Sequence, residues 1–405
     1  GNIVEITGSS RRFSSAKERL GSMNIERFGV EEWMDKYESD AKYNITDTCA
    51  RPMTLKELFA LAGEDREDFV EALFEKEQSY GSIYGLASLK EEIAGLYETI
   101  TPDDILTQHG ATGGNQHVLF SLVRPGDRVV AFSPSYQQFC STPRALGANV
   151  TVLKLRRSNG FLPDLDELRK AAARGLRLIC INNPNNPTGS LIPEDMMKEI
   201  VEIARSSGTY ILCDEVYAGV SIEGAACPSI ADLYEKGIAT GSMSKAFSLA
   251  GLRLGWLATK SQEALRQFKR VRDYDLVSCG LFDEETAALA LRHKEKILER
   301  NRAILRENLP ILDAWVKEEP RTSYVRPRAG TMALVYYDLD IDSDIFSQRM
   351  FKETGAFAVP GTCFEERRAL RIGYGHDGEA LKEGLSVVSS FMRKLEEEGI
   401  PVIKE

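Results

Sequence analysis

Residues 240–256 read TGSMSKAFSLAGLRLGW and place Lys245 directly after a serine-rich turn, with Arg253 eight residues further on. Small or apolar neighbours disfavour the charged form of a lysine, which leaves an amine that can form a Schiff base with a carbonyl. The planar guanidinium of Arg253 suits a phosphate. Taken alone, the stretch also fits a surface loop with an ordinary lysine, because Ser, Lys and Gly are common loop residues.

Short apolar runs on both sides of residue 200 alternate with helical patterns. The strand-like runs include RVVAFS, NVTVLKL, LRLICIN, GTYILCD and GIATGS, and the helical patterns include PDLDELRKAAA and PEDMMKEIVEIARSSG. Strands that alternate with helices predict an α/β fold with a mainly parallel sheet that is covered by helices on both faces. Ligands of such sheets bind at the carboxyl ends of the strands.

Polar residues stand at these strand ends: Tyr136, Asn186 in NNPNNPTG, Asp214 and Tyr217 in CDEVYAG, and Ser242. An aspartate can hold a protonated pyridine nitrogen, asparagine and tyrosine can bind a phenolic oxygen, and an aromatic ring can stack on a heterocycle. Each residue also has a simpler explanation in a turn or a helix cap. Five such residues at the strand ends of one sheet favour the chemical interpretation.

Two glycine-containing turns give weaker signals. Residues 110–114, GATGG, open a predicted helix, where backbone N–H groups and the helix dipole favour an anion. The turn matches neither a dinucleotide loop nor a nucleoside-triphosphate loop. Tyr80 lies in SYGSIYG, whose tyrosines either cover a turn or project toward a phosphate.

Length and composition restrict the class of protein. A chain of 405 residues exceeds the usual size of one hydrophobic core, so we expect two domains. The net charge of -10 and the lack of a basic run argue against nucleic-acid binding, and no stretch predicts a membrane span or a secretory signal. Seven cysteines without a CxxC pair and four scattered histidines predict free thiols in a reducing cytoplasm and no metal site.

In order and approximate spacing, NNPNNPTG, CDEVYAG and SMSKAFSLAGLRLGW resemble the motifs of the class I/II aminotransferases, which are pyridoxal 5'-phosphate (PLP) enzymes of fold type I. The resemblance implies a sheet of the seven-stranded type in a large PLP-binding domain, residues 46–290. Residues 291–405 would form a small α/β domain, and residues 1–45 an arm and a helix. It also implies a homodimer with shared sites that moves the amino group of an amino acid to a 2-keto acid through a lysine aldimine.

The resemblance further implies roles for individual residues. Lys245 matches the Schiff-base lysine, Asp214 the partner of the pyridine nitrogen, and Arg371 the clamp of the substrate α-carboxylate. Without the family, Arg371 reads as an exposed strand arginine. Asn186 and Tyr217 match the positions at the ring oxygen; Tyr217 would also be catalytic, and Asn186 would also bind the substrate. Tyr136 matches the aromatic ring that stacks on the cofactor. The positions at the phosphate are Ala111, Thr112, Ser242 and Arg253, and Tyr80 would reach the phosphate of the neighbouring subunit.

Two features depart from the family pattern. TCARP, residues 48–52, stands where members usually have a glycine-containing turn near the substrate. No second arginine matches the one that reads an acidic substrate side chain, so an aspartate-type substrate is not supported. Four acidic residues either favour a cationic substrate or are solvated helix charges: Asp273, Asp275, Asp283 and Glu284.

The motifs NGFLPDLDELR, KRVRDY and AVPGTCF also resemble the branch of the family that cyclises hydroxylated arginines, the capreomycidine synthase-like enzymes. Such an enzyme uses the same lysine and aspartate but eliminates and closes a ring, so the fold does not decide between transamination and elimination or cyclisation. A regulator that binds the cofactor without catalysis is disfavoured by the intact lysine. The sequence does not identify the substrate, the keto acid or the pathway, nor whether the N-terminal arm crosses to the partner subunit.

Overall fold

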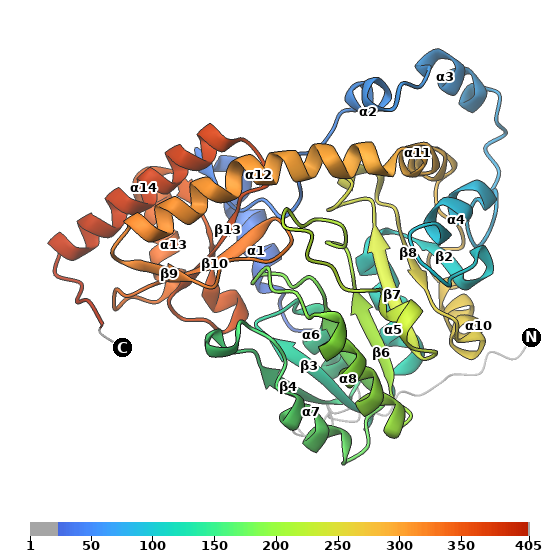
Figure 1. The fold of residues 1–405 in the computed structure, drawn as a ribbon, viewed down its shortest axis with the longest axis horizontal. Helices are drawn as coiled ribbons and strands as arrows, with labels where there is room; N and C mark the ends of the chain where they lie inside the picture. The colour runs from blue at the N-terminus through green and yellow to red at the C-terminus, as the bar shows by residue number, and fades with distance from the viewer. Residues whose placement is uncertain (1–22, 404–405) are drawn as a thin grey trace, which may run out of the picture.

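The computed structural model describes residues 23–403, and its largest sheet has seven strands in the order β2-β8-β7-β6-β5-β3-β4 (Figure 1). Within this sheet only β8 runs antiparallel to its neighbours. The strands are β2 (Ile105–Gln108), β3 (Arg128–Ser133), β4 (Asn149–Lys154), β5 (Leu178–Asn182), β6 (Tyr210–Asp214), β7 (Gly237–Ser242) and β8 (Gly255–Ala258). The predicted α/β fold with a mainly parallel sheet is confirmed.

Strand β5 illustrates why the apolar runs of the sequence become central strands. All of its residues are buried. Because successive side chains of a strand point to opposite faces, Leu178 and Cys180 belong to one core cluster, whereas Ile179 and Ile181 belong to another. A strand that is covered on both faces therefore needs a continuous apolar run.

Helices cover both faces of the large sheet. On one face, α5 (Gly110–Leu122) packs against α10 (Gln262–Arg272), and both contribute to the same core cluster. On the other face, α7 (Leu165–Ala172), α8 (Glu194–Ser206) and α9 (Ile230–Leu233) contribute to the second cluster. The helices predicted from PDLDELRKAAA and PEDMMKEIVEIARSSG are confirmed as α7 and α8.

A second, smaller sheet follows in the chain, with the antiparallel order β12-β13-β10-β9. The long helix α12 (Lys294–Glu318) leads from the large sheet to this part and packs on α14 (Gly378–Glu397) (Figure 1). The remaining elements of this part are β9 (Thr322–Tyr324), β10 (Met332–Tyr337), α13 (Ser343–Thr354), β11 (Ala356–Phe357), β12 (Val359–Pro360) and β13 (Ala369–Gly373).

The N-terminal helix docks on this smaller part of its own chain. The predicted helix is confirmed as the shorter α1 (Gly29–Tyr37), after which β1 (Tyr43–Asn44) pairs in parallel with β11. The Trp33 ring stacks on Phe357 with centroids 6.5 Å apart, and the Tyr37 ring packs at a tilt on the same side chain with centroids 5.6 Å apart. The predicted arm falls mostly on residues 1–22, outside the described residues. The predicted domain boundaries stay a prediction.

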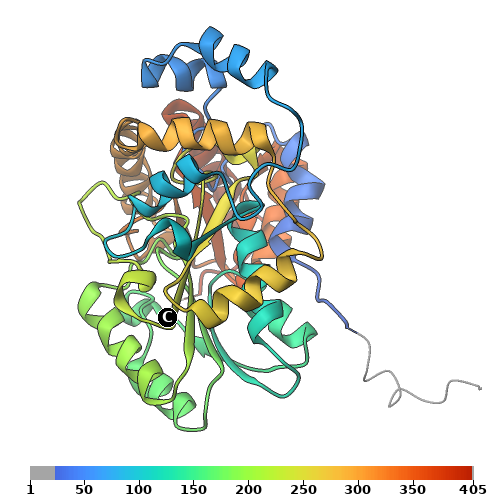
Figure 2. The ribbon, with the colours of Figure 1, turned by 90° about the vertical axis from the view of Figure 1, so that its right-hand side faces the viewer.

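Three α-helices lie between β1 and β2 in the chain, and α11 follows α10. Helix α2 (Leu55–Ala62) packs on α12, and α3 (Arg66–Phe74), which buries no residue, projects beyond it, whereas α4 (Ala87–Ala94) packs on α11 (Leu281–Arg292) (Figures 1 and 2). The segment after β8 forms three successive helices, α10, α11 and α12. No helix in the described part of the chain is long and apolar enough to span a membrane.

Candidate active site

A cavity of about 690 Å³ lies where the carboxyl ends of β5, β6 and β7 meet α1, the start of α5 and strand β13. Its lining includes ten of the eleven residues that the sequence singles out: Ala111, Thr112, Tyr136, Asn186, Asp214, Tyr217, Ser242, Lys245, Arg253 and Arg371. Residues separated by more than 250 positions in the sequence are therefore brought together as the strand-end argument predicts.

Lys245 lies in the loop of residues 243–254 between β7 and β8, which we call the lysine loop. The side chain is half-buried, and its Nζ donates a hydrogen bond to Thr48 Oγ1 at 2.6 Å. Burial lowers the pKa of Lys245, and the nearby charge of Arg371 lowers it further. A larger fraction of the amine is therefore neutral at a given pH, as a nucleophile or a base requires.

Asp214 ends β6 and is held by two donors. Its Oδ2 accepts from Asn115 Nδ2 at 3.0 Å, and its Oδ1 accepts from the backbone N–H of Val216 at 3.1 Å. Thr240 Oγ1 in turn donates to Asn115 Oδ1 at 2.7 Å and fixes the amide. Burial raises the pKa of Asp214 against the effect of these hydrogen bonds. A cationic partner in the cavity would restore the ionised form, so the carboxylate suits a protonated ring nitrogen.

The N-terminus of α5 forms a cup for an anion. Gly110 has a positive φ of 69°, and a Cβ there would come within 2.9 Å of Arg253 Nη2. A Cβ on Gly255 of β8 would come within 2.6 Å of the backbone nitrogen of Ala111. Glycine at both positions lets the backbone of α5, strand β8 and the guanidinium approach closely. Helix N–H groups and a guanidinium beside them favour a phosphate.

Arg371 is 2% exposed and reaches the cavity from β13. Its Nη1 donates to Asn186 Oδ1 at 3.3 Å and its Nη2 to the backbone oxygen of Thr46 at 3.4 Å. Within residues 23–403, its Nε has no hydrogen-bond partner. A buried guanidinium with an unmet donor is suited to a carboxylate. The alternative of an exposed strand arginine is wrong.

The two tyrosines of the cavity differ in their surroundings. Tyr217 is buried, and its hydroxyl donates to the backbone oxygen of Thr48 at 2.8 Å. A phenolic oxygen in the cavity would compete with that carbonyl for the proton. The Tyr136 ring packs at a tilt against Phe28 with centroids 5.5 Å apart, so one side of the ring is supported while the residue lines the cavity.

Tyr80 is the one predicted residue that does not line this cavity. It precedes α4 and is 71% exposed. Within this chain it therefore contacts no part of the anion cup. Its predicted role at the site of a neighbouring subunit stays a prediction.

Sequence reasoning missed several residues at the site. Thr48 lies in TCARP, where the missing family glycine was the available signal. Asn115 gave no distinct signal, because the same helix also carries the polar residues Gln116, His117 and Ser121. The cavity is also lined by acidic residues of the N-terminal segment, namely Glu26, Glu31, Asp35 and Glu38.

The acidic residues near α11 fit the expectation only in part, since Asp273 is exposed as a solvated charge would be. None of the four lines the cavity of this chain. Glu284 is not a solvated charge: it is 4% exposed and accepts hydrogen bonds from the backbone N–H of Leu86 and from Thr107 Oγ1. Asp275 pairs with the buried His117 at 2.8 Å. These two carboxylates therefore connect elements of the chain.

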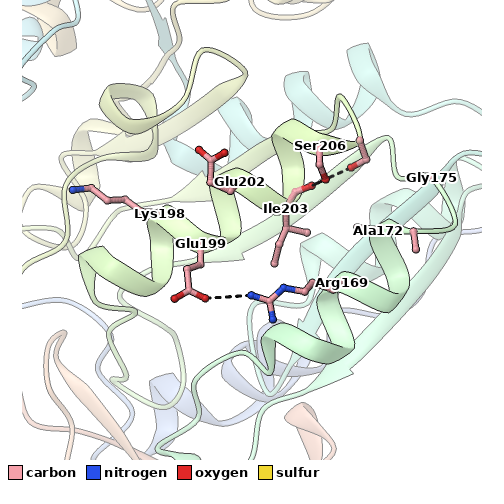
Figure 3. Close-up of a pocket in the computed structure, with 10 residues that line it drawn as sticks. Arg169, Ala172, Gly175, Lys198, Glu199, Glu202, Ile203 and Ser206 are labelled. Carbon is pink, nitrogen blue, oxygen red and sulfur yellow. Dashed lines mark hydrogen bonds and ion pairs between the residues drawn. The ribbon is translucent and has the colours of Figure 1, made fainter.

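The cavity fits PLP by the chemistry of its donors. It offers an anion cup for a phosphate, a buried carboxylate for the ring nitrogen, and an amine of lowered pKa for the aldehyde. Residues 23–403 hold no group of three His, Cys, Asp or Glu side chains that could bind a metal ion. A second hollow of about 890 Å³ lies between α7 and α8, where Arg169 pairs with Glu199 (Figure 3), and it contains none of the predicted site residues.

Comparisons with known proteins identify the family of the chain. The family model for aminotransferase class I and II matches residues 53–388. The chain is 27% identical to the capreomycidine synthase of Streptomyces vinaceus, covering 89% of this chain and 92% of that protein. It is 28% identical to an aspartate aminotransferase of Pyrococcus horikoshii, covering 75% and 80%. A solved PLP-dependent aminotransferase from Streptococcus suis 89-1591 is similar with 42% identity and a TM-score of 0.89, covering 92% of this chain and 99% of that one.

Proposed function

Because the chain belongs to the aminotransferase class I and II family, we propose that Lys245, Asp214 and Arg371 perform its amino-group transfer in the cavity described above. The enzyme uses PLP and moves an amino group from an amino acid to a 2-keto acid. The observation that supports these roles most strongly is that the amine of Lys245 and the carboxylate of Asp214 line one cavity with the anion cup.

When bound, PLP supplies an aldehyde that condenses with amines and a ring that withdraws electrons from the substrate α-carbon. Arg371 holds the α-carboxylate of the amino acid and so orients the Cα–H bond. Nζ of Lys245 would take the α-proton of the amino acid and would return it to the cofactor carbon that carries the aldehyde. Asp214 keeps a proton on the ring nitrogen. Tyr136 would cover the ring face, and the α5 N-terminus with Arg253 would hold the phosphate.

Substitution of Lys245 tests these roles. Lys245→Ala is expected to reduce kcat by about 10²–10⁴-fold, the usual contribution of a positioned acid–base group, while the protein keeps its thermal melting temperature within a few degrees. Lys260→Ala, a change of a lysine just beyond β8, serves as the matched control and keeps wild-type kcat. Full turnover by the Lys245→Ala protein would refute the assignment.

The charge of the cavity supports a substrate with a cationic side chain. Among the described residues, Arg253 and Arg371 are the only arginines of the lining, and both have proposed roles. Although burial lowers the pKa of Lys245 and of Arg371, the carboxylate of Glu31 opposes that shift at both. We call Glu26, Glu31, Asp35 and Glu38 the acidic wall. This wall therefore lies close enough to the reacting groups to attract a guanidinium or an ammonium group.

The same wall favours a second candidate, elimination and cyclisation of a hydroxylated arginine, since one relative is a capreomycidine synthase. A panel of arginine, hydroxyarginine, ornithine, alanine and aspartate with 2-oxoglutarate separates the two. Transamination gives pyridoxamine phosphate absorbance and a new amino acid, whereas cyclisation proceeds without keto acid. We expect Glu31→Gln to lower kcat/KM for the cationic substrates about 5- to 30-fold relative to alanine; an unchanged ratio would exclude the acidic wall as the selector.

Exposed aromatic side chains support a homodimer. Around α4 and α11, Tyr80, Tyr84, Tyr274 and Phe282 are exposed, and such a group of large side chains is typical of a protein interface. A second copy that covers them would bring Tyr80 to the partner's phosphate site. Light scattering should give twice the 45.1 kDa chain mass, and Tyr80→Phe should weaken PLP binding about tenfold.

All seven cysteines are free, which supports a reducing, cytoplasmic location.

A further inference from the structure

The segment of residues 45–51, which we call the strap, runs from the smaller sheet to the lysine loop. At its start, the backbone N–H of Gly373 donates to the oxygen of Ile45 at 2.9 Å. Toward its end, Ser248 of the lysine loop donates from Oγ to the oxygen of Ala50 at 3.1 Å. The strap is therefore fixed at one end to β13 and at the other to the loop that bears the reactive amine.

Thr48 lies in the middle of the strap and is held through its backbone. Its carbonyl oxygen accepts hydrogen bonds from the hydroxyls of Tyr217, at 2.8 Å, and of Thr331, at 2.9 Å. Its own hydroxyl accepts from Nζ of Lys245 at 2.6 Å. A rigidly placed hydroxyl thus meets the end of a long, flexible side chain.

We propose that Thr48 is the positioning residue of Lys245, holding the amine in place whenever that amine is not joined to the cofactor. The inference rests on the proposed role of Lys245 as the base. A lysine side chain carries its amine on a flexible stem of four carbons, so the amine can easily move away from the substrate. Proton transfer needs heavy atoms about 2.6–3.2 Å apart, and a displacement of about 1 Å can cost about 10²-fold in rate.

The chemistry of a hydroxyl suits this task better than that of a carboxylate. A carboxylate beside Lys245 would stabilise the ammonium form strongly and remove the base at neutral pH. A hydroxyl accepts one N–H without a full negative charge. It therefore orients the amine and leaves the lowering of its pKa by burial largely intact.

The test begins with apoprotein, so that it does not depend on turnover. Wild type, Thr48→Val, Thr48→Ser and Thr331→Val are labelled with acetic anhydride over a range of pH, and mass spectrometry of the Lys245 peptide gives the apparent pKa of the amine. The loss of one hydrogen bond to the ammonium form should lower that pKa by about half a unit to one unit in Thr48→Val. Thr48→Ser should restore the wild-type value. Thr331→Val removes only one of the two donors to the Thr48 carbonyl and keeps the Thr48 hydroxyl, so its change in pKa should be smaller than that of Thr48→Val.

In the holoenzyme, Thr48→Val should lower kcat about 10- to 100-fold and move the acidic limb of the kcat pH profile in the direction of the labelling pKa, with KM changed less than about threefold. Thr48→Ser should recover kcat to within about threefold of wild type. An unchanged labelling pKa in Thr48→Val, or the same losses in Thr331→Val, would overturn the inference. The Lys245→Ala result decides the proposed function separately, since it does not involve Thr48.

Discussion

Replacement of Gly255 by alanine should weaken both PLP binding and the fold, because β8 has no space for a side-chain carbon there. The added Cβ would lie 2.5 Å from the carbonyl carbon of Gly110, 2.6 Å from the nitrogen of Ala111 and 2.7 Å from the oxygen of Gly241. Ordinary contacts begin near 3.4 Å, so the strand must move by about 0.7–0.9 Å from α5 or from β7. All three atoms belong to backbone, which cannot rotate away.

Overpacking of this kind costs about 1–3 kcal/mol, and more where backbone must shift. Since Ala111 belongs to the anion cup, a displacement of α5 also separates its N–H groups from the phosphate. If the displacement of α5 weakens the binding of the phosphate by about 1.4 kcal/mol, the PLP dissociation constant rises about tenfold.

The assay is an absorbance titration of apoprotein with PLP, together with thermal melting of the same samples. Gly251→Ala is the matched control, because it lies in the lysine loop, has no positive φ, and a Cβ there meets nothing within 4 Å. Equal dissociation constants and melting temperatures for the Gly255→Ala and Gly251→Ala proteins would refute the reasoning.

Two further results are expected. Arg371→Gln should raise KM for the amino acid about 10²-fold, since it removes a charge-assisted contact to the carboxylate. The PLP dissociation constant should stay within about threefold of the wild-type value. Steady-state kinetics measure KM and an absorbance titration measures the dissociation constant, and an unchanged KM would contradict the role of Arg371. Burial raises the pKa of Glu215 to about 7, so the native state binds more protons than the unfolded state between about pH 4.5 and 7. Stability should then fall as pH rises through that window, by up to about 3 kcal/mol, and urea unfolding of Glu215→Gln should lack this loss; parallel curves for both proteins would exclude it.

The central strands of the large sheet could be predicted because apolar runs such as LICIN are buried on both faces, and burial of that kind leaves a local pattern. Strand β8 escaped prediction because GWLA is short and lies within a stretch that had been interpreted through its lysine. Its antiparallel direction depends on pairing with β2, which is distant in the sequence.

Most of the proposed cofactor residues could be predicted to lie in one cavity because they follow strands, and parallel strands end at one edge of a sheet. Thr48 could not, since its contact with Lys245 joins segments 197 residues apart and the strand before it, β1, belongs to a different sheet. Glu284 was misjudged because a charged residue on a helix is usually solvated, whereas this one satisfies a backbone N–H of another segment. Long-range hydrogen bonding of this kind leaves no periodic signal.

The antiparallel course of β8 also affects how the enzyme can be engineered. Ser242 and Gly255, which flank the lysine loop, are paired partners on adjacent strands, so the loop leaves and re-enters the sheet about 4.8 Å apart. A segment closed in this way can be altered without stretching any crossover helix, but Ser248 has to stay because it anchors the strap. Libraries at Ala250, which lines the cavity, and at the exposed Gly251 would vary the surroundings of the amine without changing the core.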